Sequence, residues 1–169
     1  MQKALILIIL SLLITSIAWA GYLDVGISAD LYTPSDSDAG TTLLYGLNAN
    51  YFINPTWIAR GELQYANYKT GGKTHSLMPI KLSAIGHLLP GQALDPYVGA
   101  GLGYFTEMVD GTKASSNLGG QLIAGVSWVF LNTALSFELQ YVLPSFSGGK
   151  GFLSYGGDLH GQTGFAVPF

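Results

Sequence analysis

The chain has 169 residues, 49% of them hydrophobic and only 10% charged, whereas about a quarter of a typical soluble domain is charged. It contains no cysteine, which excludes disulfides, thiolate catalysis, cysteine-ligated zinc and a lipoprotein acylation site. Its net charge of −3 gives no electrostatic support for a nucleic-acid partner.

The first twenty residues have the order of an export signal. Lys3 supplies a positive charge, residues 4–14 form an apolar run, and Ala18-Trp19-Ala20 resembles a cleavage site. A transmembrane helix needs about twenty apolar residues, and this run is shorter. We therefore expect residues 1–20 to be a signal peptide that is cleaved after Ala20, and residues 21–169 to form one domain.

Beyond Gly21 the sequence repeats with a period of two, which is typical of strands with one apolar and one polar face. No window shows a helical period over three turns. Pro79 cannot donate to a ladder, so the strand that contains it should start late or be irregular there. In chain order we expect eight strands, at residues 22–32, 42–53, 57–68, 77–88, 96–107, 118–130, 134–143 and 157–169.

The connections between these strands alternate in length. Those after the first, third, fifth and seventh strands are polar and span eight to thirteen residues, at 33–41, 69–76, 108–117 and 144–156. Two of the other three connections are three residues or fewer. Long loops on one side and short turns on the other are typical of an outer-membrane barrel, with both termini at the periplasmic end.

The distribution of charged and aromatic residues separates a membrane barrel from a soluble β-sandwich. A sandwich would intersperse charges over its outer faces, but here nearly every charge lies in a loop or on the polar face of a strand. Aromatic residues of the apolar faces should form two interfacial girdles. We expect Tyr51, Trp57, Trp128, Phe130 and Phe169 at the turn end, and Tyr45, Tyr65, Tyr104 and Tyr141 at the loop end.

Two segments resemble a known group of proteins. The segment Asp95-Pro96-Tyr97-Val98-Gly99-Ala100-Gly101-Leu102-Gly103-Tyr104 is similar to the central strand of small outer-membrane β-barrels, which include the opacity-type adhesins and the OmpA- and OmpW-like proteins. The terminal Phe165, Val167 and Phe169 alternate as in the closing strand that the barrel-assembly machinery reads. The resemblance implies an all-β, eight-stranded antiparallel up-and-down transmembrane barrel in the outer membrane. Its partners would be outer-membrane lipids and lipopolysaccharide, and during insertion the assembly machinery. We expect a monomer.

An eight-stranded barrel has an interior that side chains just fill. At mid-height its polar faces carry Arg60, Glu62, Lys81 and Glu138. We expect Arg60 or Lys81 to reach Glu138 across the lumen, so that two cations and two anions neutralise each other as buried charges must. The simplest role of this lumenal charge network is a structural plug; the alternative is a gated polar pore.

Small residues define a second candidate site. Gly99, Gly101 and Gly103 of the fifth strand should face Gly26 and Ser28 of the first strand across the barrel. The barrel must either flatten there or leave a slot. A slot would bind or pass small hydrophobic molecules, as the resemblance to OmpW-like proteins implies.

Enzymatic and metal sites find less support. The small-barrel lipid A deacylases, which the glycine-rich fifth strand resembles, need a His-x-Ser pair and a Glu that face lipid. The matching segment Glu138-Leu139-Gln140-Tyr141 lacks both His and Ser, and we expect His75 in a loop and His87 and His160 pointing inward. Asp36 and Asp38 indicate a solvated loop rather than a calcium site. We therefore expect no enzyme activity, no cofactor and no metal, and a structural or surface-interaction role.

Overall fold

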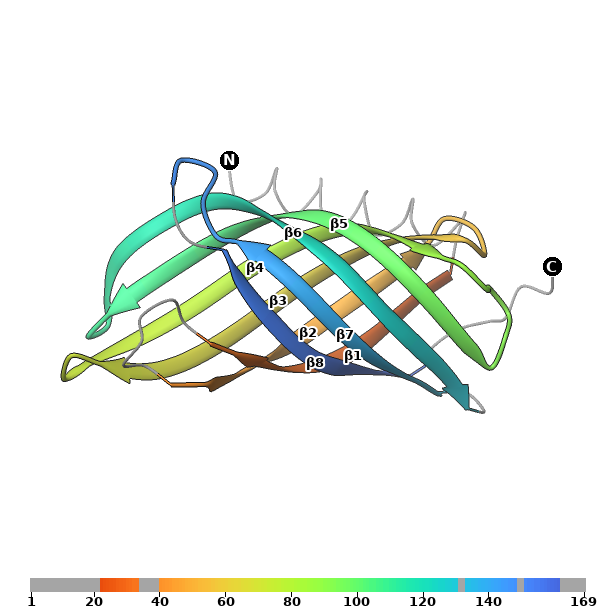
Figure 1. Cartoon of the computed structure of the whole chain (residues 1–169), viewed down its shortest axis with the longest axis horizontal. Coiled ribbons are helices and arrows are strands. Elements are labelled where there is room, and N and C mark those ends of the chain that lie inside the picture. The colour runs from red at the N-terminus through yellow and green to blue at the C-terminus, as the bar shows by residue number, and fades with distance from the viewer. Residues whose placement is uncertain (1–21, 34–39, 131–132, 149–150, 162–169) are drawn as a thin grey trace, which may run out of the picture.

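A computed structural model describes residues 22–33, 40–130, 133–148 and 151–161 of the chain. Eight antiparallel strands follow one another around a closed barrel, each paired with its neighbours in the sequence, and the last pairs with the first (Figure 1). Within the described residues no helix is long and apolar enough to cross a membrane. The strands are β1 (Tyr22–Tyr32), β2 (Thr42–Phe52), β3 (Trp57–Thr70), β4 (Lys73–His87), β5 (Leu94–Val109), β6 (Thr112–Phe130), β7 (Thr133–Leu143) and β8 (Phe152–Gly161).

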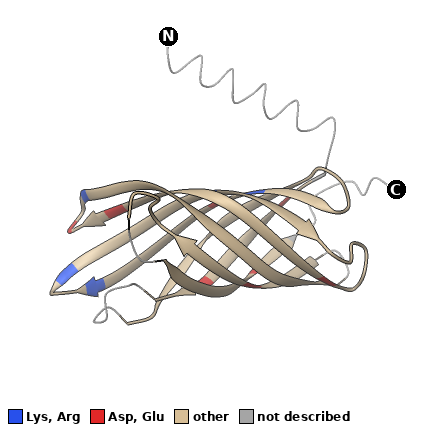
Figure 2. Ribbon diagram, turned by 45° about the horizontal axis from the view of Figure 1, so that its top comes forward, with Lys and Arg blue, Asp and Glu red and all other residues tan. Residues whose placement is uncertain are grey.

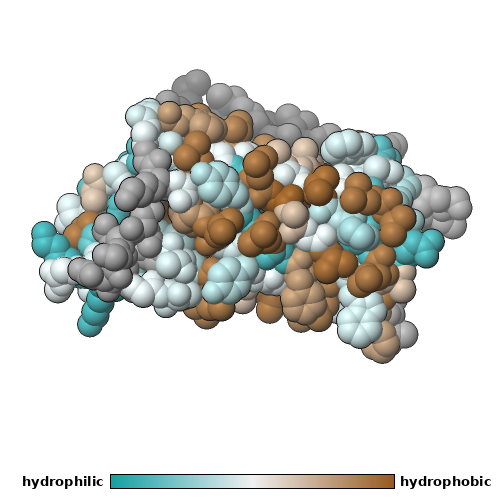
Figure 3. Space-filling model, viewed as in Figure 1, coloured by the Kyte–Doolittle hydropathy of each residue, from teal (hydrophilic) through white to brown (hydrophobic). Residues whose placement is uncertain are grey.

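The alternation of residues decides which side chains face out. Leu47 and Leu82 point outward and are 62% and 65% exposed, whereas their strand neighbours Asn48 and Lys81 are buried inside. The outward apolar side chains form a band across the middle of the barrel wall (Figure 3). This band is what a lipid-facing wall requires. The expected fold, an eight-stranded antiparallel up-and-down barrel with apolar residues outside, is confirmed.

The strands are longer at one end than the sequence indicated. The expected loops 69–76 and 108–117 are wrong, because β3, β4, β5 and β6 continue through them as strands. Two-residue turns join these strands, Gly71-Gly72 with φ of 57° and 77° and Asp110-Gly111 with φ of 49° and 78°. Left-handed pairs of this kind match the twist of a tight hairpin. The four strands therefore extend as two hairpins at the end where β1 finishes, which we call the mouth end (Figure 1).

The hairpins of the mouth end are joined to each other. His75 of β4 pairs with Val109 of β5, and the backbone N–H of Asp110 donates to the carbonyl oxygen of Thr74 over 2.9 Å. β2 and β7 do not reach as far, since the last paired residues against them are Ala66 and Gly120. The extension is therefore one continuous four-stranded sheet, which we call the projecting sheet.

Pro79 makes its strand irregular, as one of the two expected outcomes, but it does not make the strand start late. The β3–β4 register is irregular beside it, because Leu63 pairs with Ile80 and the next paired residues are Ala66 and Leu77. The strand does not start late, since β4 begins at Lys73. A missing backbone donor thus disturbs one ladder locally without ending the strand.

The closing strand also differs from its expected range. β8 begins at Phe152 rather than at residue 157, so the expected loop 144–156 is too long. It pairs with both β7 and β1, which removes any free edge at the seam. Phe165, Val167 and Phe169, and the expected signal peptide, lie outside the described residues.

Candidate functional site

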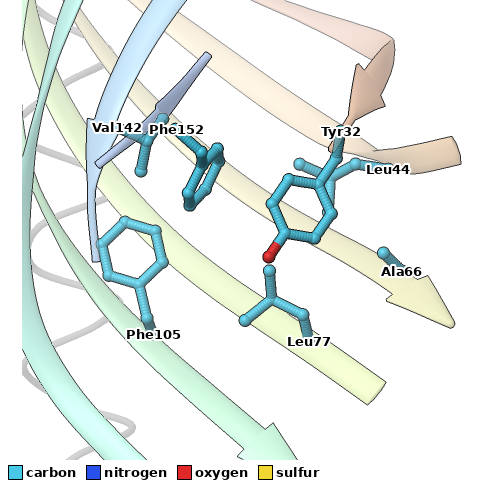
Figure 4. Packing of buried hydrophobic residues seen from close by; sticks show 7 residues of the cluster. All are labelled: Tyr32, Leu44, Ala66, Leu77, Phe105, Val142 and Phe152. Atoms are coloured by element: carbon cyan, nitrogen blue, oxygen red, sulfur yellow. The ribbon is translucent and has the colours of Figure 1, made fainter. Parts of the chain in front are cut away.

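The interior of the barrel is filled in three layers. A cluster of buried apolar residues lies at the mouth end, and we call it the mouth cluster (Figure 4): Tyr32, Leu44, Ala66, Leu77, Phe105, Val142 and Phe152. A second cluster lies at the opposite, turn end and comprises Ile58, Ile85, Tyr97 and Ile123, with Phe52 packed against it. Buried polar and charged side chains lie between the two clusters, among them Asp30, Asn48, Glu62, Lys81, Gln121, Glu138 and Asp158.

Arg60 is the centre of the polar layer. Its guanidinium pairs with Glu138 of β7 and lies 3.1 Å from Asp158 of β8. Its Nε donates to Asn50 Oδ1 over 2.9 Å, and its charge lies 5.8 Å from the centre of the Tyr97 ring. One cation therefore ties together five strands through side chains that are far apart in the sequence.

A second chain of contacts continues from Glu138. The Tyr97 hydroxyl donates to one of its carboxylate oxygens over 2.6 Å, and the Gln140 amide donates to the other over 2.9 Å. Lys81 donates to Gln140 over 3.0 Å and pairs with Glu62 at 3.2 Å. The structure thus brings all four residues of the expected charge network into one buried layer. Arg60 rather than Lys81 reaches Glu138 directly.

The layer holds more carboxylates than the sequence reasoning included. Asp24, Asp30 and Asp158 are also buried there, so the expected balance of two cations against two anions is wrong. Asp24 and Asp30 lie on the polar face of the expected strand 22–32, so the sequence pattern could have included them. Asp158 lies within the expected last strand, 157–169, and has the same parity as His160, which was expected to point inward, but the expected charge network did not include it. Hydrogen bonds compensate in part, since the Gln64 amide donates to Asp30 over 2.7 Å.

Some buried polar atoms have no hydrogen-bond partner among the described residues. They belong to Asn48, Gln64, Gln121 and His160, and to Glu62, whose Oε1 forms the ion pair with Lys81 but no hydrogen bond. Buried amides without hydrogen bonds are rare in proteins, and ordered water usually satisfies them. We therefore expect water molecules within the polar layer, held between the two apolar clusters.

The glycines of the expected slot are covered by neighbouring side chains. A Cβ atom added to Gly26 would lie 2.5 Å from His160 Nδ1 and 2.6 Å from Asn48 Oδ1. One added to Gly103 would lie 2.6 Å from the ring of Phe105. Gly99 and Gly101 lie close to the backbone of β4, and Ser28 accepts a hydrogen bond from Gln64 over 3.1 Å. The small residues thus make room for neighbouring side chains and for the backbone of β4.

A cavity of about 260 Å³ lies at the mouth end, beside the mouth cluster. Its lining includes the rings of Tyr32, Phe105 and Phe152, and the polar side chains of Glu107 and Ser115. The Glu107 carboxylate is held by the Tyr68 hydroxyl at 3.3 Å and by His75 Nδ1 at 2.9 Å. His75 was expected in a loop, but it lies on β4. We call this the mouth cavity.

The outward aromatic residues lie in pairs near the two ends of the wall. Tyr45 and Tyr65 are neighbours on β2 and β3, with ring centres 6.0 Å apart. Trp128 and Phe130 of β6 are 6.5 Å apart at the turn end. These pairs agree with the two expected girdles, of which Phe169 lies outside the described residues.

The segment that was compared with the lipid A deacylases does not present its polar residues to lipid. Glu138 and Gln140 are buried in the lumen, whereas Leu139 and Tyr141 are the exposed residues of this stretch. Among the described residues, no group of three or more histidines and carboxylates could hold a metal ion. The polar layer consists of ion pairs and hydrogen-bonded amides.

No protein-family model and no curated protein matches the sequence, but solved structures match the fold. Neisserial surface protein A is 21% identical, with a TM-score of 0.61, over 85% of this chain and 97% of its own. The fold is that of the small outer-membrane β-barrels. The N-terminal barrel domain of Pseudomonas aeruginosa OprF is 22% identical, with a TM-score of 0.54, over 83% of this chain and 98% of its own. Yersinia pestis Ail, solved with the heparin analogue sucrose octasulfate, is 11% identical, with a TM-score of 0.56, over 83% of this chain and 95% of its own.

Proposed function

We propose that the protein is an integral outer-membrane barrel with a closed lumen and a structural or surface-interaction role. The observation that carries this proposal is the layered interior, in which two apolar clusters enclose a buried network of ion pairs. An ion would have to displace both clusters and separate Arg60 from Glu138 to cross. The fold shared with outer-membrane barrels supports the location.

The mouth end is the face that we assign to the cell exterior. Lys69, Lys73 and Lys113 are exposed on the projecting sheet, and Figure 2 shows basic positions, together with acidic ones, near the ends of its hairpins. The turns 53–56 and 88–93 at the other end contain no Lys or Arg. Cations at the outer surface would attract the phosphates of lipopolysaccharide. The complex of Ail with a sulfated sugar is consistent with a polyanion at such a surface.

Conductance in planar bilayers tests the closed lumen. We expect no channels from the wild-type protein, and none from Glu138→Ala, because both apolar clusters remain in place in this variant. Steady ion-conducting openings of the wild type would overturn the closed lumen and favour the gated pore. Passage of small hydrophobic molecules finds no support in the described interior, since side chains cover the glycines of the expected slot.

Cysteine labelling tests the orientation, because the chain has no cysteine of its own. We expect Lys113→Cys to react with a membrane-impermeant maleimide on intact cells. Thr56→Cys, exposed in the β2–β3 turn, should react only after the outer membrane is opened. The reverse pattern would show that the mouth end faces the periplasm. Mass measurement of the mature protein tests cleavage after Ala20.

A further inference from the structure

The mouth cavity combines two features that the plug does not need. Its carboxylate, Glu107, lines the cavity and keeps 33% of its side chain exposed. Its floor is aromatic, with Tyr32 and Phe152 in edge contact at 4.5 Å between ring centres. The cavity is open at the mouth end, whereas the apolar cluster beneath it is closed.

The carboxylate is held in place from three sides. Tyr68 and His75 stack at 5.2 Å between ring centres, and both reach the same oxygen of Glu107. Ser115 lies 3.5 Å from the other oxygen, Oε2, which leaves Oε2 with capacity to accept a further donor. The β5–β6 register shifts between Glu107 and Met108, and irregularities of this kind re-aim side chains beside binding sites.

The chemistry of this lining selects a ligand class. The described lining contains one carboxylate and no Lys or Arg, so a negatively charged group would meet Glu107 without a cationic side chain to offset it. Ring faces attract cations, and a carboxylate adds direct charge pairing. The volume of about 260 Å³ is below the range of about 300–1,000 Å³ typical of drug-sized ligands, so the occupant is small.

We propose that the mouth cavity binds a small organic cation, an ammonium group with apolar substituents, between Glu107 and the aromatic floor. The ammonium pairs with Oε2 of Glu107, the oxygen whose contact with Ser115 is long. Its alkyl groups contact the rings of Tyr32, Phe105 and Phe152. This site does not depend on whether the lumen conducts ions, since it lies outside the mouth cluster.

The test uses choline and its neutral isostere, 3,3-dimethyl-1-butanol, which share a shape and differ in charge. The protein is placed in phosphatidylglycerol nanodiscs, which contain no competing ammonium lipid, and binding is followed by ligand-observed NMR. We expect saturable choline binding, with the isostere at least about tenfold weaker because a charge-assisted contact is lost.

Two matched variants locate the binding. Glu107→Gln removes the charge and keeps the shape, and should weaken choline binding about tenfold. Asp110→Asn removes an acidic charge from the tip of the same projecting sheet, where Asp110 Oδ1 accepts from Thr74 N at 3.0 Å, and should leave binding within about twofold. Heat-modifiable gel migration shows that each variant is folded. Equal binding of choline and the isostere, unchanged binding by folded Glu107→Gln, or no saturable choline binding would each overturn the proposal.

Discussion

Replacement of Arg60 by Met should strongly destabilise the barrel. The change keeps much of the side-chain length but removes the cation that pairs with Glu138 and Asp158, and the Nε–H that Asn50 accepts. Two carboxylates then remain in the interior without their cation. Breaking a buried pair by removing one partner costs about 3–5 kcal/mol, and we expect a loss of this size in the free energy of unfolding.

The partner substitution Glu138→Gln should cost less. Arg60 keeps Asp158 in this variant, and the main new conflict is between the amides at positions 138 and 140. A loss of about 1–3 kcal/mol follows from the disturbed hydrogen bonds. The double variant should be less destabilised than the sum of both single changes, because Glu138 is no longer left as an unpaired charge.

Urea unfolding from lipid vesicles measures these differences. Trp57 and Trp128 are half-exposed on the lipid-facing wall, so their fluorescence should change when the barrel leaves the membrane. Lys113→Met removes an exposed cation at the mouth end and should stay within about 0.5 kcal/mol of wild type. If Arg60→Met is no less stable than Lys113→Met, water rather than ion pairing solvates the lumenal charges, and the reasoning about the plug fails.

Three further predictions concern the backbone and the terminus. Gly46→Ala should lower the free energy of unfolding by about 1–3 kcal/mol in the same assay, because its Cβ would press on the Leu63 carbonyl oxygen. Gly61 has open space around it, so Gly61→Ala should not lower it. Equal stability of the two variants would contradict the packing argument. Gly111→Ala should lower the free energy of unfolding by about 1–2 kcal/mol, because φ is 78° at this position. An unchanged urea midpoint would show that the hairpin relaxes without strain. Deletion of Phe169 should lower the fraction of protein that reaches the heat-modifiable form in cells, and normal assembly without it would exclude the terminal residue as an assembly signal.

The sequence alone determined the number of strands and the face of each side chain. A strand turns successive side chains to opposite faces, so the parity of a position is a local property. For this reason Glu62, Lys81 and Glu138 could be assigned to the interior before any pairing was known. The reversal of the chain near Gly71-Gly72 was likewise expected, but as the longer loop 69–76 rather than as a two-residue turn.

The tertiary structure decided strand length and partners. Residues 112–117 are polar apart from Ala114 and lie outside the apolar band, so their pattern resembles a loop. Pairing with β5 keeps them extended. Arg60 meets Glu138 across 78 residues of sequence, and that contact depends on how far the strands are staggered when the barrel closes. The same stagger fills the space beside Gly26 with His160 and Asn48, and it brings Tyr32 and Phe152, from the first and last strands, together at the floor of the mouth cavity.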